Sequence, residues 1–389
     1  MRKGNLSEAE ELARQRQDSK LREVQRQEEL SREKKLLEES RSKAKQALQG
    51  KLASQKAGKG IWDKYSYHII FGVLGLLVLL AVLGKTPNET RRSVEIQVNE
   101  EAFIQKVNAD GRPYQVGHSS FFDGWTLYDV KQILKNGFTK KKSVPRCPPL
   151  SNELQMDKYL FSDKYPNCVR PVQNQGNCSS GFAFAVTSVY NDRFCVASEG
   201  AQTFSASPQH ALACDKIGSK GCLGGFLVGT LDLGRVAGFV DTECLPYNTS
   251  AADTCDAKSL KTCKRSFVTD YCVAEGVNEI KNQISTGGPV AALVQVTREF
   301  LIYKGGVYDE SMSDYKLDGL QAVKIVGWDE DVNGQEYWVI ENSWGSDWGE
   351  NGYAKIRMNV LDAMIDKFAV GCNTNSEKKK DEEKRPDEE

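Results

Sequence analysis

The pattern of apolar and polar positions changes twice within the first 84 residues. Residues 1–64 are dense in Glu, Gln, Lys, Arg, Ala and Leu, which favour helices. Their apolar positions are too sparse for a sustained heptad seam, so we predict a long, solvated, charged helix with only local coiled-coil character. Residues 65–84 follow as an apolar run without Asp, Glu, Lys or Arg. A run of this length matches the thickness of a bilayer core and predicts a transmembrane helix.

The pattern beyond residue 84 predicts a linker region, a globular body and a tail. Residues 85–150 are charged and mixed, with two short amphipathic helices expected near 103–108 and 130–134. Residues 151–375 form the body: helices are expected at about 181–195, 226–237 and 277–286, and strands at about 290–296, 321–328, 336–341 and 352–358. A helical half followed by a β half is an α+β architecture. Residues 376–389 form a charged tail that we expect to be disordered.

Charge and cysteine placement indicate how the chain sits in a membrane. The formal net charge is −1, so we expect no nucleic-acid binding, except for a contact that the basic N-terminal helix could make. All 11 cysteines follow the apolar run. This placement is typical of a chain whose first part lies in a reducing compartment and whose second part lies in an oxidising one. The alternative is that the cysteines are reduced thiols buried in the domain. Lysines are also concentrated before the run. We therefore predict a type II orientation, with a cytosolic N-terminus and a lumenal or extracellular domain in the secretory pathway, in the ER or a derived compartment.

Residues 172–186, VQNQGNCSSGFAFAV, carry the first chemical motif. The segment resembles the active-site segment of papain-like cysteine proteases, Gln-Gly-x-Cys-Gly-Ser-Cys-Trp-Ala-Phe, in which the second Cys is the nucleophile. Gln175, Gly176 and Cys178 are in register with that pattern, but Gly181 stands at the nucleophile position. Since glycine has no side chain, this position cannot attack a carbonyl carbon.

The position of the catalytic base is also changed. The resemblance places the base in residues 319–328, GLQAVKIVGW, where Gln321 stands at the position of the histidine. A glutamine amide does not take up a proton near neutral pH. The chain has three histidines, His68, His118 and His210, and none is expected to substitute. The resemblance therefore implies an inactive member of the family, which hydrolyses no peptide.

The supporting parts of the site are retained. The resemblance makes Gln175 the side-chain donor to the oxyanion, Asn342 the residue that orients the base, and Trp344 the ring that shields that bond. Gly224 and Gly225 match a turn whose backbone pairs with an extended substrate, so the groove could hold a peptide without cutting it; equally, these glycines could serve the turn alone. We expect neither a cofactor nor a metal ion.

The cysteines are similar to those of the cathepsin B branch. The resemblance implies a Cys178–Cys222 bond, a bond from Cys214 to the region of Cys255–Cys272, and a Cys168–Cys195 bond typical of that branch. The partners of Cys214 and Cys244 among Cys255, Cys263 and Cys272 stay open, as do those of Cys147 and Cys372. The odd total leaves at least one cysteine free or available to another chain.

Three glycosylation sequons follow the apolar run, at Asn88, Asn177 and Asn248. Asn88 is close to the predicted membrane, and Asn177 lies in the active-site loop. Asn248 lies in a polar loop and is the expected acceptor.

Taken together, the chain is predicted to be a single-pass type II membrane protein with a lumenal, papain-like, two-domain fold: a helical left half and an antiparallel, barrel-like right half. Residues 93–139 loosely resemble the short pro-segment of cathepsin B-like enzymes and are expected to stay in place as a cover. The predicted function is a binding or assembly module in a membrane complex with protein partners. Two alternatives are an enzyme with unconventional catalytic residues and an adaptor whose cytosolic helix makes the main contact.

Overall fold

A computed structural model describes residues 96–139, 143–148, 156–200, 204–216, 218–256, 258–313, 315–360 and 363–374. The chain divides into two units, Met1–Pro87 and Asn88–Glu389, and every described residue lies in the second. The predicted cytosolic helix, the predicted transmembrane helix and the charged tail lie outside the described residues. Within the described ranges, no helix is both long and apolar enough to span a bilayer.

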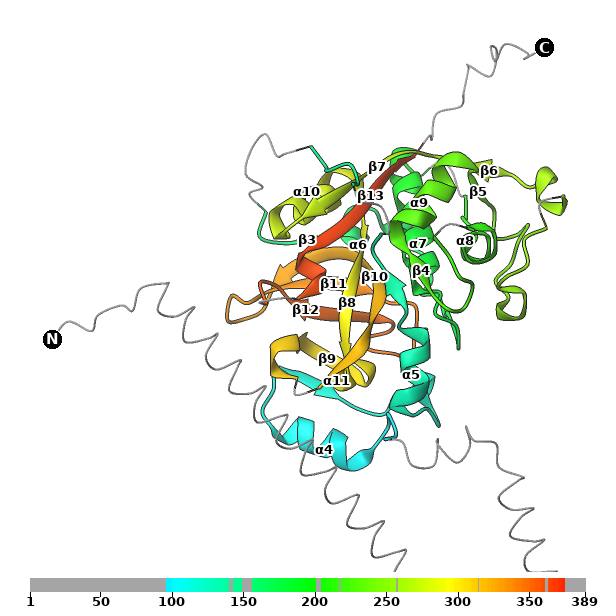
Figure 1. The fold of residues 1–389 in the computed structure, drawn as a ribbon. Helices are drawn as coiled ribbons and strands as arrows, with labels where there is room; N and C mark the ends of the chain where they lie inside the picture. The colour runs from blue at the N-terminus through cyan, green and yellow to red at the C-terminus, as the bar shows by residue number, and fades with distance from the viewer. Residues whose placement is uncertain are drawn as a thin grey trace, which may run out of the picture. The chain divides into compact units, whose positions relative to one another are not determined.

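A nine-stranded sheet forms the centre of the second unit, in the order β1-β9-β12-β11-β10-β8-β13-β7, with β3 paired to β10 (Figure 1). Its strands are β1 (Tyr114–Val116), β3 (Tyr159–Leu160), β7 (Val268–Glu275), β8 (Val290–Thr297), β9 (Tyr303–Tyr308), β10 (Lys316–Glu330), β11 (Glu336–Glu341), β12 (Tyr353–Arg357) and β13 (Phe368–Thr374). Strands β12 and β9 pair in parallel, so the prediction of an antiparallel β half was wrong on this point. The connection from β9 to β12 passes through β10 and β11, and a connection of this length permits parallel pairing.

Helices α7, α8 and α9 lie together on one side of this sheet, α10 lies on another, and α4, α5 and α11 lie at one end of the domain (Figure 1). The helices are α4 (Glu101–Ala109), α5 (Leu127–Ile133), α6 (Phe161–Lys164), α7 (Gly181–Ala197), α8 (Pro208–Cys214), α9 (Leu227–Val236), α10 (Val277–Gly287) and α11 (Arg298–Leu301). Helix α7 is buried at every residue from Gly181 to Cys195, as expected for a helix that crosses a core. Two small sheets, β2 (Asn136–Gly137) with β4 (Gly225–Phe226) and β5 (Phe239–Val240) with β6 (Arg265–Ser266), complete the described strands.

The two larger hydrophobic cores correspond to the two predicted halves. One joins α7, α8 and α9 to part of the sheet, and includes Phe182, Tyr190 and Phe239. The other fills the β half, where Trp344 and Trp348 are fully buried. The α+β architecture expected from the sequence is therefore confirmed.

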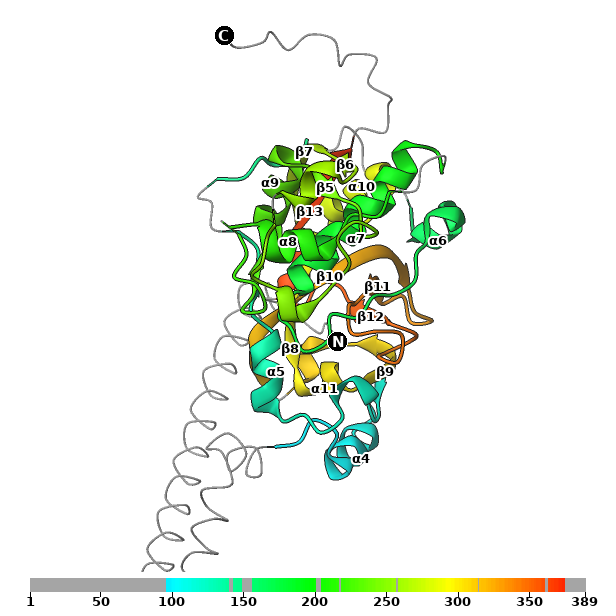
Figure 2. The ribbon, with the colours of Figure 1, turned by 90° about the vertical axis from the view of Figure 1, so that its right-hand side faces the viewer.

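Residues 97–139, here called the cover segment, are built into the β half. Strand β1 extends the main sheet by pairing with β9, and both views place α4 beside α11 and β9 (Figure 2). Helix α5 begins at a capping box made by Thr126 and Asp129, which satisfies backbone N–H groups at the helix start. The apolar side chains of the segment, among them Val107, Phe122 and Leu134, belong to the same core as the sheet.

Five disulfides cross the described domain: Cys147–Cys272, Cys168–Cys195, Cys178–Cys222, Cys214–Cys255 and Cys244–Cys263. The bonds of Cys178 and Cys168 join the pairs that the family resemblance implied, and Cys147–Cys272 is a pair that the sequence left open. Cys372 is a buried free thiol. Five disulfides are typical of a domain in a lumenal or extracellular compartment.

Candidate functional site

The site lies where the first turn of α7 meets strand β10. Gly181 is the first residue of α7, and a Cβ atom placed on it would lie 3.0 Å from both Nε2 and Oε1 of Gln321. The same Cβ would lie 3.2 Å from Oε1 of Gln175. The positions that the resemblance assigns to the nucleophile and the base are therefore neighbours, and carboxamide groups fill the space beside Gly181.

Hydrogen bonds connect these carboxamides into one network. Gln321 Nε2 donates to Gln175 Oε1 at 2.9 Å and to Asn342 Oδ1 at 3.0 Å. Ser343 Oγ donates to Gln175 Oε1 at 2.6 Å, and Gln175 Nε2 donates to the Cys178 carbonyl at 2.9 Å. All of these side chains are buried. The network is uncharged, and none of its members accepts a proton at neutral pH.

Trp344 packs against the cover segment rather than standing open to solvent. Its ring stacks on Phe121 with centroids 5.9 Å apart and meets Phe122 edge-on at 5.1 Å. Among the hydrogen bonds of the described residues, none reaches the buried Nε1 of Trp344 or the buried Nδ2 of Asn342. The aromatic cluster therefore closes the site from the side of the cover segment.

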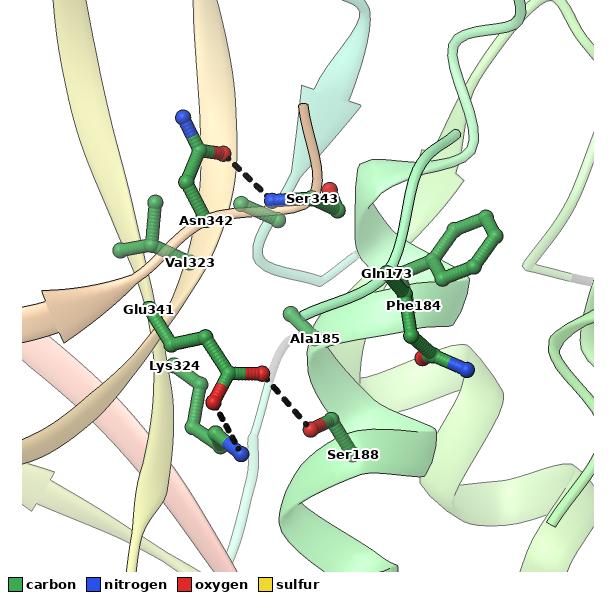
Figure 3. A pocket seen from close by; sticks show the side chains of 10 residues that line it. Gln173, Phe184, Ala185, Ser188, Val323, Lys324, Glu341, Asn342 and Ser343 are labelled. Atoms are coloured by element: carbon green, nitrogen blue, oxygen red, sulfur yellow. Dashed lines mark hydrogen bonds and ion pairs between the residues drawn. The ribbon is translucent and has the colours of Figure 1, made fainter. Parts of the chain in front are cut away.

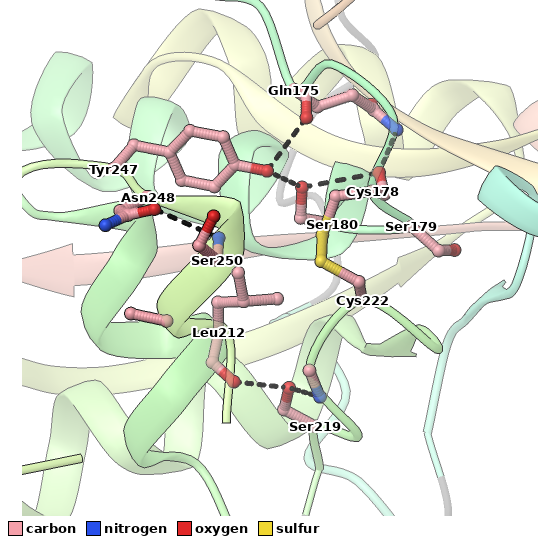
Figure 4. The surroundings of a disulfide bond; sticks show 12 residues. Gln175, Cys178, Ser179, Ser180, Leu212, Ser219, Cys222, Tyr247, Asn248 and Ser250 are labelled. Carbon is pink, nitrogen blue, oxygen red and sulfur yellow. Dashed lines mark hydrogen bonds between the residues drawn. A yellow bond between two sulfur atoms is a disulfide. The ribbon is translucent and has the colours of Figure 1, made fainter. Parts of the chain in front are cut away.

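The two serines before Gly181 are tied to other groups. Ser179 Oγ accepts from the backbone N–H of Lys135 at 2.9 Å. Ser180 Oγ lies 2.7 Å from the hydroxyl of Tyr247, which donates to the Gln175 carbonyl at 2.8 Å (Figure 4). Burial raises the pKa of Tyr247 to about 12, so this phenol is protonated at neutral pH. In the described part of the chain, neither serine bonds to an imidazole or a carboxylate.

The histidines of the described residues lie elsewhere. His118 contacts Asp123 on the exposed side of the cover segment, at 2.8 Å. His210 belongs to α8, where burial lowers its pKa to about 4, so it is neutral at physiological pH. His68 lies outside the described residues.

The predicted peptide groove contains part of the chain itself. Strand β4, which begins at Gly225, pairs in parallel with β2 of the cover segment, and a Cβ on Gly224 would lie 1.9 Å from the Lys135 carbonyl oxygen. On the opposite wall, the N–H of Leu320 donates to the Leu134 carbonyl at 2.9 Å. Residues 134–138 therefore run between the two walls.

A buried ion cluster lies behind the site, between α7 and strands β10 and β11 (Figure 3). Lys324 Nζ lies 2.6 Å from Asp192 Oδ2 and 2.9 Å from Glu341 Oε2. Ser188 Oγ donates to Glu341 at 3.4 Å. Burial raises the pKa of Asp192 to about 6, although Lys324 opposes this shift. Burial alone would lower the pKa of Lys324, but attraction to the two carboxylates outweighs it and raises that pKa.

Sequence reasoning missed this cluster, although two signals were present. Asp192 is the single acidic residue of the buried helix α7, and Lys324 interrupts the apolar run of β10. Charged residues at such positions are rarely buried without a partner, so the two could have been proposed as a pair. Groups of side chains suited to hold a metal ion do not occur within the described ranges.

The glycosylation candidate Asn248 lies in an exposed loop. Its Oδ1 accepts from the backbone N–H of Ser250 at 3.0 Å (Figure 4). The side chain is thus at the surface in a local turn, and its glycosylation stays a prediction.

Comparisons with known proteins agree with this geometry. Residues 160–372 match the family model described as papain family cysteine protease. Cathepsin B-like CP3 of Giardia intestinalis is 31% identical over 288 residues, which cover 71% of this chain and 93% of that protein. The human tubulointerstitial nephritis antigen-like protein is 29% identical over 308 residues, which cover 69% of this chain and 66% of that protein.

A solved structure is similar as well. Procathepsin B S9 from Trypanosoma congolense superposes with a TM-score of 0.65 at 25% identity, covering 72% of this chain and all of that chain. The chain belongs to the papain family of cysteine proteases. Its relatives include cathepsin B-like proteins.

Proposed function

We propose that the protein is a membrane-anchored pseudoprotease of the cathepsin B-like branch, which binds or assembles with other proteins and hydrolyses no peptide bond. The observation that carries this proposal is the contact between Gly181 and Gln321. Hydrolysis by a thiol protease needs a thiolate and a base within reach of it. Glycine supplies no nucleophile, and the glutamine amide supplies no base. Since the triad acts as a unit, the loss of two members leaves no route to an acyl-enzyme.

The neighbouring side chains support the same conclusion. Cys178 is held in a disulfide with Cys222. The free thiol of Cys372 is buried in β13, and burial raises its pKa to about 11, so it is a poor nucleophile at neutral pH. Within the part of the chain that the structure describes, Ser179 and Ser180 have no base among their hydrogen-bond partners.

Membrane anchoring rests on residues 65–84 and on the lysines that precede them. The five disulfides support a lumenal or extracellular position for the folded domain. A rigid, disulfide-linked domain held close to a bilayer suits an assembly role, with protein partners in a membrane complex.

The test of inactivity uses the full-length chain purified in detergent, incubated with a peptide library and with a thiol-directed probe. We expect neither cleavage nor labelling in the unaltered chain. The variant Cys372→Ser controls for labelling of the free thiol, and an active cathepsin B controls the assay. Cleavage by the unaltered chain that survives removal of contaminating proteases would overturn the proposal in favour of an enzyme with unconventional residues.

A second experiment separates the assembly module from the adaptor. Crosslinking in intact membranes followed by mass spectrometry identifies partners, and the same experiment is repeated without residues 1–56. We expect partners to remain attached to the shortened chain. Their loss would make the cytosolic helix the main contact.

A further inference from the structure

The cover segment pairs with the main sheet, enters the candidate site through Asn136 and is followed by a disulfide to β7. We infer that residues 134–138 are a built-in occupant of the groove, held by Asn136 in the degenerate site and kept in place by the Cys147–Cys272 disulfide. After a cut on the C-terminal side of Cys147, a peptide then gains access to the groove only once this disulfide is also broken. This inference deepens the proposed function, because it places the partner-binding surface outside the groove.

Asn136 links the two halves of the domain through a single side chain. Its Oδ1 accepts from the backbone N–H of Phe182, next to Gly181, at 2.8 Å. Its Nδ2 donates to the Leu320 carbonyl at 2.9 Å and to Gln321 Oε1 at 3.4 Å. Each end of this carboxamide therefore meets a complementary partner in a buried position, where an unpaired polar group would be costly.

Gly181 and Gln321 fit this arrangement together. Gln321 accepts from Asn136 through Oε1 and donates to Gln175 and Asn342 through Nε2. A residue with a Cβ at position 181 would crowd both of these atoms. The two substitutions thus create a site that takes a carboxamide on an extended backbone, and the ligand is Asn136 of the same chain.

Backbone contacts hold the residues on either side of Asn136. The N–H of Lys135 donates to Ser179 Oγ at 2.9 Å, and the Phe138 carbonyl accepts from the N–H of Val228 at 3.1 Å. A Cβ on Gly137 would lie 2.7 Å from the ring of Phe226, so the close approach of β2 to β4 requires glycine at this position.

The segment is anchored before it enters the groove. Arg298 Nη2 donates to the Gln97 carbonyl at 2.8 Å and to Glu100 at 2.6 Å. The guanidinium of Arg298 also lies 3.9 Å from the centre of the Phe103 ring. These contacts fix the start of the cover segment to α11.

The segment is also anchored after it leaves the groove. Cys147 forms its disulfide with Cys272 in β7, and the N–H of Cys147 donates to the Val273 carbonyl at 2.9 Å. Lys158 is exposed and lies between this anchor and the body of the domain. A cut anywhere between Pro148 and Lys158 therefore leaves residues 97–147 covalently attached.

The test uses the full-length chain with a specific protease site inserted after Leu150. The probe is a fluorescent peptide of residues 131–139, followed by anisotropy under non-reducing conditions. We expect no uptake by the uncut chain or by the cut chain, whose fragments migrate together without reductant. We expect the cut Cys147→Ser/Cys272→Ser variant to release its segment and take up the probe at least tenfold better, while the uncut double variant does not.

Asn136 is tested separately by hydrogen exchange in the uncut chain. In the variant Asn136→Leu we expect the amides of residues 134–138 and of Phe182 to exchange at least tenfold faster than in the matched control Gln132→Leu, whose side chain is exposed on the same segment. Equal exchange in the two variants would overturn the role of Asn136.

Two further outcomes would overturn the inference. Probe uptake by the cut, disulfide-linked chain that equals uptake by the cut double variant would show that the groove is not locked. Full retention of the segment by the cut double variant would show that the disulfide is not what keeps it. Neither outcome measures peptide hydrolysis. The inference about the groove can therefore be wrong while the proposed inactivity holds, and the reverse.

Discussion

Lys324 Nζ lies 2.6 Å from Asp192 Oδ2 and joins the strand that carries Gln321 to the helix that begins at Gly181. Asp192 is about three turns further along α7 than Gly181. The two halves of the domain are thus connected by a buried ion pair behind the candidate site and by neutral carboxamides within it. Removing water from both ions is costly, so the pair affects how stability depends on pH.

The raised pKa of Asp192 predicts that the domain gains stability as the pH falls from 7 towards 4. Burial raises the pKa of Asp192 from 3.8 to about 6, so between these values the folded state holds a proton that the unfolded state has released. The free energy of unfolding therefore falls as the pH rises through this window, by on the order of 3 kcal/mol. Lys324 stays charged throughout, because its pKa is raised.

The measurement is urea unfolding of the wild type and of Asp192→Asn between pH 4 and pH 7. The variant removes this titration, so the difference between the two proteins isolates Asp192 from the other groups. We expect the wild type to lose stability relative to the variant as the pH rises. The opposite slope would contradict the prediction.

The variant Gly181→Ala tests the packing of the carboxamides around Gly181. The added Cβ lies 3.0 Å from the Gln321 amide and 3.2 Å from Gln175 Oε1, so these side chains must shift and their hydrogen bonds weaken. We expect a loss of about 1–3 kcal/mol in the free energy of unfolding. Thermal and urea unfolding measure it.

A double-mutant cycle supplies the control for this variant. Gln321→Ala removes the carboxamide that the new methyl group meets. Gly181→Ala should therefore cost less in the Gln321→Ala background than in the wild type. Equal costs in both backgrounds would mean that the strain arises elsewhere.

Substitution of the buried Arg193 is expected to lower the free energy of unfolding strongly. Its buried guanidinium donates to the carbonyls of Pro289, Gly288, Gln283 and Cys372, which links α7 to α10 and β13. In Arg193→Met these carbonyls lose their donors, and we expect the free energy of unfolding to fall by at least about 3 kcal/mol.

Arg235→Met is the matched control for this change, because Arg235 is about half exposed and its ion pair with Asp232 is long, at 3.5 Å. Exposed pairs of this kind contribute about 0–1 kcal/mol. Similar losses in the two variants would show that the buried carbonyl contacts are not what stabilises α7.

The sequon at Asn248 predicts a glycan on the expressed protein. The loop is exposed, and the membrane orientation proposed above places it in the lumen. We expect an amidase that removes N-glycans to increase the gel mobility of the wild type, and the shift to disappear in Asn248→Gln and Ser250→Ala. The neighbouring change Thr249→Ala leaves the sequon intact and should keep the shift. A wild type without the shift would contradict the prediction.

Much of the architecture could be predicted, because it depends on local pattern. Helix α10 and strand β11 follow from the apolar pattern and from nearby glycines, whereas the start of α7 at Gly181 follows from the family resemblance. The resemblance to papain-like motifs also placed Gln321 and Asn342 in the same site. The structure places both within hydrogen-bond distance of each other.

Contacts between distant positions could not be predicted in the same way. Asn136 and Gln321 are 185 residues apart, and nothing in the local sequence of either indicates the other. The Cys147–Cys272 bond spans 125 residues, and cysteine spacing alone does not choose among the pairings of 11 cysteines. The ion pair of Lys324 with Asp192 depends on how β10 packs against α7, which the sequence of the strand alone does not indicate.

The unpaired Cys372 has a consequence for biosynthesis. Once folded, its thiol is enclosed and protonated, since burial raises its pKa to about 11, so it exchanges with disulfides slowly. Before folding, the same thiol competes with ten others for partners. Mispairing therefore threatens only the chain that has not yet folded. Replacing Cys372 by serine should raise the yield of correctly folded protein more than it alters the folded protein.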